Sequence, residues 1–209
     1  MDEALDRLYR TVYRAARAGE INRTDAFDLA ASVLELKPAD PDAGELASLS
    51  LDGAGVSRSR MAELALTLLE EAGFRPGFTE EPEWLTRLED AMRLVNQDVA
   101  ATGLPDRCRL RVDEDHWPGH NGNAHAETWD GHAGTGGGIV PASGADPVSA
   151  LVAVAEDAQD AVMHSLWSVW PVCPVHRLGV HARSHDDAAV WWCGSGRHAV
   201  AAIGAWPDR

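Results

Sequence analysis

The sequence of 209 residues predicts an α+β protein. We expect an N-terminal helical bundle, then a small antiparallel-sheet domain with one long helix and a zinc-ribbon-like C-terminal hairpin. Two observations predict this class. Apolar residues repeat at helical spacing through Val99, and beyond that point they alternate or form short runs around one further helical stripe. The change of period predicts a helical domain over 1–104 and an α+β domain over 107–209.

The helices of the first domain are indicated by apolar stripes and by residues that begin or end helices. One stripe runs from Leu5 to Ala16 and stops before Gly19. Asn22 and Ser57 precede two further stripes, and short polar side chains at such positions accept hydrogen bonds from the first helical N–H groups. Short connections between helices favour an antiparallel bundle.

Two more helices are expected in this domain. A short helix is expected over 45–51, and a longer one from Glu83 until Gly103 and Pro105. Glycine ends helices readily, and proline cannot continue one.

The second domain begins with alternating residues. The run 107–115 alternates apolar and charged side chains, which is typical of a half-buried strand, and 123–130 can form a second strand. Asp146 and Pro147 then mark the start of a long helix. Its expected buried stripe is Leu151, Val154, Ala155, Ala158, Val162, Leu166 and Val169. The remaining tail offers two or three strands, "GVHAR", "AAVWWC" and "HAVAAIG".

The tail over 170–206 carries two Cys/His pairs. Cys173 and His176 are followed, after sixteen intervening residues, by Cys193 and His198. Thiolate and imidazole are the preferred ligands of zinc, and two short-range pairs on one hairpin supply a tetrahedral, structural site. Two other interpretations stay open at this point: the cysteines are buried apolar residues, or they form a reactive thiol site.

Two further histidines, His181 and His185, lie close enough in sequence to replace one of these ligands. The glycines Gly194 and Gly196 within the second pair suggest a turn with positive φ angles.

The long helix and the tail resemble a known group of sequences. "WPVCPVH" and "VWWCGSG" are similar to the "WPxCPxH" and "VWxC" hairpin motifs of an uncharacterised family common in actinobacteria. The resemblance covers about 60–70 residues. It implies that residues 146–206 fold as one module, and it implies no activity.

A second group of histidines suggests an alternative function. The segment from His116 to His132 also holds His120 and His125, with several carboxylates between them. Histidine binds metals and serves as a general base near neutral pH. The alternative function is therefore a small metal-dependent enzyme that uses this loop. A solvated hairpin loop explains the same residues.

A third function class follows from residues 55–73. "GVSRSRMAELALTLLEEAG" resembles the recognition helix of a helix-turn-helix, with Arg58 and Arg60 at its start. A DNA-binding regulator would use these arginines. The net charge of −15 argues against any nucleic-acid partner, because such a protein repels phosphate groups.

Composition limits where the protein works. No apolar run approaches the ~20 residues of a membrane helix, so we expect no membrane association. The segment "MDEALDRLYRTVYRAARAGE" lacks the pattern of a secretory signal, and three cysteines do not suggest a disulfide framework. These observations favour a cytoplasmic protein.

No nucleophile or cofactor motif stands in a supporting context. We therefore expect a non-enzymatic protein-binding or accessory protein, regulatory or immunity-like, with a structural zinc ion. The acidic charge favours a basic protein partner. Trp191 and Trp192 are expected on opposite faces of one strand. Either one packs under the long helix and the other is covered by the helical domain, or one is exposed as an anchor for a partner.

Overall fold

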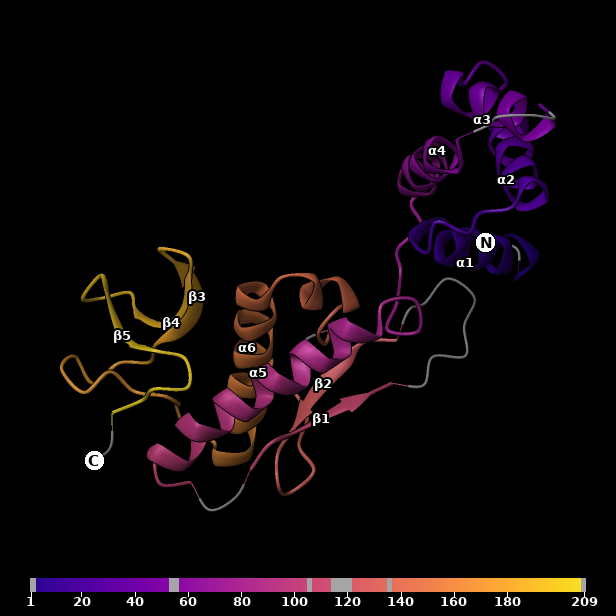
Figure 1. Cartoon of the computed structure of the whole chain (residues 1–209). Coiled ribbons are helices and arrows are strands. Elements are labelled where there is room, and N and C mark those ends of the chain that lie inside the picture. The colour runs from indigo at the N-terminus through magenta and orange to yellow at the C-terminus, as the bar shows by residue number, and fades with distance from the viewer. Residues whose placement is uncertain (1–2, 53–56, 105–106, 114–121, 135–136, 208–209) are drawn as a thin grey trace. The chain divides into compact units, whose positions relative to one another are not determined.

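The computed structural model describes residues 3–52, 57–104, 107–113, 122–134 and 137–207, and it confirms the α+β class (Figure 1). The chain divides into two compact units, the first of which ends at Glu80 and the second of which begins at Glu81. The sequence predicted the boundary between 104 and 107, which is one helix after the observed division. Helix α5 (Pro82–Ala101) packs against α6, against a short 3-10 helix and against β1, all in the second unit.

The first unit contains four described helices. They are α1 (Glu3–Arg17), α2 (Arg23–Leu36), α3 (Pro41–Leu51) and α4 (Arg58–Glu71). Asn22 and Ser57 accept hydrogen bonds from Asp25 N and Arg60 N, so both predicted caps are confirmed. Helix α3 begins four residues earlier than expected, because Asp40 caps it and Pro41 occupies its first turn.

The core of the first unit joins all four helices. Val12, Leu29, Leu46 and Leu68 are fully or almost fully buried in it. At its edge the Arg10 guanidinium lies 2.9 Å from Glu80, whose side chain is 1% exposed.

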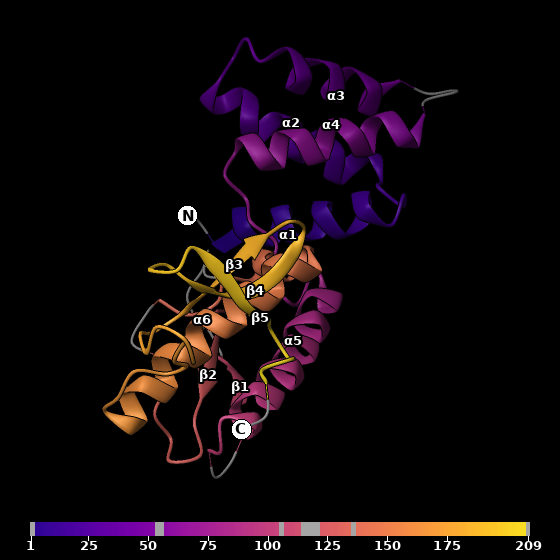
Figure 2. The ribbon, with the colours of Figure 1, turned by 90° about the vertical axis from the view of Figure 1, so that its left-hand side faces the viewer.

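The second unit combines two helices with two small antiparallel sheets. Strands β1 (Arg109–Val112) and β2 (Ala124–Glu127) pair with each other. Strands β3 (His181–His185), β4 (Ala188–Cys193) and β5 (His198–Ala202) form the second sheet in that order. Helix α6 (Pro147–Leu166) packs on α5, on β2 and on both β3 and β4, as the turned view shows (Figure 2). The 3-10 helix over Pro141–Ala145 leads into α6.

The end of α6 differs from the expectation. Trp167 follows the helix with a φ of 51°, in the left-handed region, so the helix stops at Leu166. Leu166 and Val169, expected on the buried stripe, are 36% and 55% exposed. The middle of the expected stripe is confirmed, since Val154, Ala155, Ala158 and Val162 are buried, and Ala150 is buried in place of the half-buried Leu151.

The two adjacent tryptophans of β4 lie as predicted. Trp191 is fully buried, and its indole donates to Asp98 in α5 at 2.7 Å. Trp192 is half-buried on the other face, beneath the Arg183 guanidinium at 4.8 Å. None of the described helices is long and apolar enough to cross a membrane.

Candidate metal centre

A tight loop between α6 and β3 presents the first Cys/His pair. Cys173 N donates to Leu178 O at 2.8 Å, and Arg177 N donates to Cys173 O at 2.9 Å. Arg177 adopts a positive φ of 57°, which closes the loop. His176 N also donates to the Cys173 sulfur at 3.5 Å. The loop therefore turns the sulfur and the His176 imidazole toward the same point.

The turn between β4 and β5 presents the second pair. Cys193 is the last residue of β4 and His198 the first of β5, and the two face each other across the ladder. Gly196 lies between them against both imidazoles: a Cβ there would stand 2.3 Å from His176 Cε1 and 2.5 Å from His198 Cδ2. The glycine is needed for this close approach. The positive φ expected at Gly194 and Gly196 occurs at Arg197 instead, at 50°.

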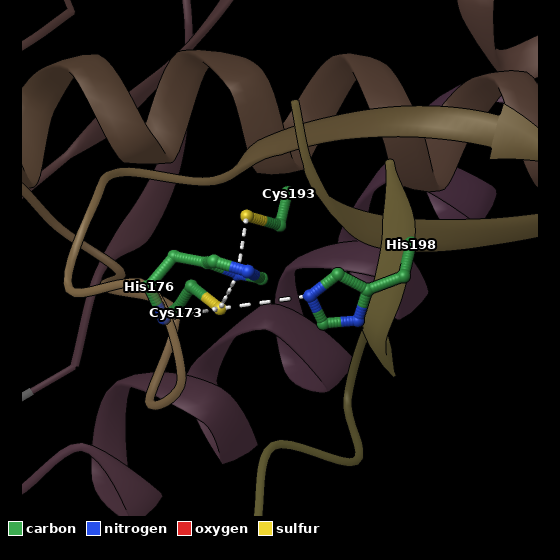
Figure 3. A group of neighbouring side chains, drawn as sticks. All are labelled: Cys173, His176, Cys193 and His198. Atoms are coloured by element: carbon green, nitrogen blue, oxygen red, sulfur yellow. Dashed lines mark hydrogen bonds between the residues drawn. The ribbon is translucent and has the colours of Figure 1, made fainter. Parts of the chain in front are cut away.

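The four side chains meet in one cluster, which we call the Cys/His cluster (Figure 3). His176 Nδ1 lies 3.5 Å from Cys173 Sγ and 3.4 Å from Cys193 Sγ. His198 Nε2 lies 3.7 Å from Cys173 Sγ. The four ligand atoms lie within 4.8 Å of one another, so the group can hold a metal ion.

The surroundings of the cluster favour thiolate and orient the imidazole. Burial raises the pKa of Cys173, but hydrogen bonds from His176, Val175 and His198 outweigh it and lower the pKa to about 6. His198 Nδ1 lies 3.1 Å from Ala199 O. Donation to that carbonyl leaves Nε2 free to bind a metal.

Other cysteines and histidines of the second unit lie outside the cluster. Cys108 is buried beside α5, and burial raises the pKa of its thiol to about 11. His181 and His185 project from β3, and His185 packs on Trp192 with ring centroids 4.7 Å apart. Neither histidine belongs to the Cys/His cluster.

The histidines of the alternative enzyme site are only partly described. His116 and His120 lie outside the described residues. His125 Nε2 lies 2.8 Å from Asp113 Oδ2, whereas His132 Nδ1 lies 3.0 Å from Asp130. In the part of the chain that the structure describes, these side chains form no converging group of three or more ligands.

One of the two arginines expected at a DNA-binding surface, Arg60, has carboxylate partners. Arg60 donates to both Glu45 oxygens at 2.8 Å and lies 3.6 Å from Glu63. These contacts neutralise the guanidinium charge that a phosphate group would need.

Two carboxylates that carry no sequence motif are buried in the helices of the second unit. Asp157, on α6, is 8% exposed and accepts from Ala126 N at 2.6 Å. Asp98 is fully buried in α5. Each lies among apolar residues on one face of its helix. Those apolar neighbours are the only feature of the sequence that indicates the burial of such a carboxylate.

The comparisons with known proteins give no relative. No family model, no curated protein and no solved structure matches the chain.

Proposed function

We propose that the Cys/His cluster binds one zinc ion. With Zn–S distances of about 2.3 Å and Zn–N distances of about 2.0–2.1 Å, a tetrahedral site has S···N edges of about 3.5 Å. Three of the four S···N distances of the cluster are 3.4, 3.5 and 3.7 Å. Two thiolates and two imidazoles match the donor preference of zinc.

The zinc ion has a structural role in this proposal. Four protein ligands complete a tetrahedral shell and leave no position for water or substrate. Both cysteines are fully buried, which keeps reagents away from the sulfur atoms. Zinc–thiolate bonds persist where thiols stay reduced, so we place the protein in the cytoplasm.

The function that we propose is that of a non-enzymatic binding or accessory protein. The closed ligand set of the Cys/His cluster carries this proposal, because it serves to hold a surface in place rather than to activate water. The zinc-stabilised sheet acts as a scaffold for contacts with another protein.

Elemental analysis tests the zinc proposal. Protein purified without added metal or chelator should contain one zinc per chain, and the Cys173→Ser/Cys193→Ser variant should contain none. Cys108→Ser is the matched control, since Cys108 lies outside the cluster, and it should keep its zinc. Zinc retained by the double variant would rule out this cluster as the site.

A second experiment tests the binding role. The tagged protein, produced at its native level, should retain one specific protein partner after cross-linking, and the double cysteine variant should lose it. Recovery of no specific partner, or turnover of a small molecule by the zinc-loaded protein, would overturn the binding role.

A further inference from the structure

The segment that leads from α6 into the Cys/His cluster exposes an unusual amount of apolar surface. Half of the twelve exposed large apolar residues in the described part of the chain fall between residues 166 and 178. We call them the 166–178 patch: Leu166, Trp167, Val169, Val172, Val175 and Leu178. Trp167 is 88% exposed and Val175 72%. Apolar residues gathered in this way mark an interaction site more often than a bare surface.

Local contacts hold part of the patch together. Val172 pairs with Gly179 across a short antiparallel bridge. A Cβ at Gly179 would stand 2.7 Å from Val169 Cγ1, so Val169 lies against the same glycine. Leu178 is tied back by the hydrogen bond from Cys173 N to its carbonyl. Val169, Val172 and Leu178 therefore lie close together around Gly179.

The backbone beneath the patch is fixed at several points. The buried Gln159 amide donates to Trp170 O at 2.8 Å and to Val180 O at 2.6 Å, and so ties both sides of the loop to α6. The Trp170 indole donates to Thr102 Oγ1 at 2.9 Å. A surface that is already ordered loses little conformational entropy when it binds. The left-handed conformation of Trp167, costly for a bulky residue, is held within this frame.

The stretch of sequence that carries the patch is basic, although the whole chain is acidic. The chain has a net charge of −15, yet no carboxylate occurs between Asp160 and Asp186. That stretch carries Arg177 and Arg183. Asp130, which accepts from Ser165 at 2.5 Å near this end of α6, also accepts from Thr128. The patch is thus apolar, with Arg177 between Val175 and Leu178 and the Asp130 carboxylate near its Leu166 end.

We propose that the 166–178 patch binds an acidic amphipathic segment of a partner protein, with Trp167 and Val175 as its apolar anchors and Arg177 as the contact for carboxylates. This inference rests on the proposed binding function and names its surface. This proposal replaces the basic partner expected from the net charge with an acidic one. Charges more than about 8–10 Å from the patch are screened at physiological salt, so the charges next to the patch decide which partner binds.

Selection from a random-peptide display library tests the inference on the zinc-loaded full chain. The enriched peptides should combine Asp or Glu with Leu, Ile, Phe or Trp. Trp167→Ala should weaken their binding by about tenfold or more, as is usual for a tryptophan anchor. Arg177→Glu should weaken the acidic peptides selectively. Leu36→Ala is the matched control, because Leu36 is 78% exposed but lies on α2, and it should bind unchanged.

Three results would overturn the inference. They are enrichment of no peptide, enrichment of basic peptides, and binding that Trp167→Ala and Val175→Ser leave intact. Sedimentation with phosphatidylserine–phosphatidylcholine vesicles that depends on Trp167 would assign the patch to a lipid surface instead. Zinc content and capture of the native partner are measured on the same variants. A partner still captured by Trp167→Ala would leave the binding function standing and place it on another surface.

Discussion

At the residue scale, Asp98 makes more hydrogen bonds than any other buried polar side chain among the described residues of the second unit. Its carboxylate accepts from Trp191 Nε1, Gly204 N and Trp206 N at 2.7–2.8 Å. Burial raises the pKa of Asp98, and these hydrogen bonds partly offset that effect. One side chain of α5 thereby holds the end of β4 and the segment after β5.

Asp98→Ala should lower the free energy of unfolding of the second unit by about 3 kcal/mol. The change leaves three donors without an acceptor in a buried place. Urea denaturation followed by tryptophan fluorescence measures the loss. The control is Asp90→Ala on the same helix, whose side chain is 54% exposed and should change stability by less than about 0.5 kcal/mol. Equal losses in both variants would contradict this role of Asp98.

Gly196 is a second residue whose role depends on close approach. Gly196→Ala should weaken zinc binding about 10–100-fold, because the added methyl displaces the His176 and His198 imidazoles from their positions. Competition with a chromophoric chelator measures the affinity. Gly194→Ala is matched to it, since nothing lies within 4 Å of a Cβ at Gly194, and its affinity should be unchanged. If both variants bind zinc like the native chain, these imidazoles are not ligands.

The residues of the Cys/His cluster could be named from the sequence, because each pair is local and its residue types suit one ion. The role of Gly196 could not, since the sequence shows a glycine but not what lies against it. The burial of Asp157 could not be predicted from the sequence either. Its partner is Ala126 N, 31 positions away, and nothing in the local pattern shows that a strand covers that face of α6.

At the scale of elements, the glycine-rich connection between β2 and α6 contains positions that a side chain cannot occupy, and Gly138 is one of them. Gly138 has a φ of +76°, and a Cβ there would stand 2.4 Å from His125 Cε1 on β2. The neighbouring Ile139 bridges to Ala124, so the connection adds a short third pairing to the β1–β2 sheet.

Gly138→Ala should therefore destabilise the second unit by about 2–3 kcal/mol, through backbone strain and through displacement of His125. Gly137→Ala should change stability by less than about 0.5 kcal/mol, because nothing lies within 4 Å of a Cβ at that position. Chemical denaturation of both variants checks the difference. A neutral Gly138→Ala would mean that the connection does not pack on β2 in solution.

Most elements could be predicted because their signals are local. Asn22, Ser57 and Asp146 each cap a helix where the sequence indicates one. The end of α6 was misplaced because the apolar spacing continues to Val169, although the helix stops before Trp167. An apolar period shows which residues can share a face, and it does not show where the backbone leaves the helix.

At the scale of the whole molecule, each unit has its own core, and the Cys/His cluster belongs to the second. Calorimetry should therefore show two transitions. A zinc chelator should lower the transition temperature of the second unit by several degrees and leave that of the first unchanged, because metal binding stabilises only the state that holds it. The Cys173→Ser/Cys193→Ser variant should not respond to the chelator. A single transition that shifts as a whole would show that the units unfold together.

The division of the chain shows what a change of period can and cannot predict. The α+β class follows from the period alone. The place of α5 does not, because its helical stripe looks the same whether it packs on the helices before it or on α6 and β1 after it.

The contacts of Asp98 also set the order in which the two units can fold during translation. Its three partners lie 93, 106 and 108 positions later in the chain. While a ribosome is making those residues, the carboxylate stands in water, and the second unit cannot close its core. The first unit is complete at Glu80 and can fold while synthesis continues. We therefore expect the first unit to be folded on the ribosome before the second unit can close its core around Asp98.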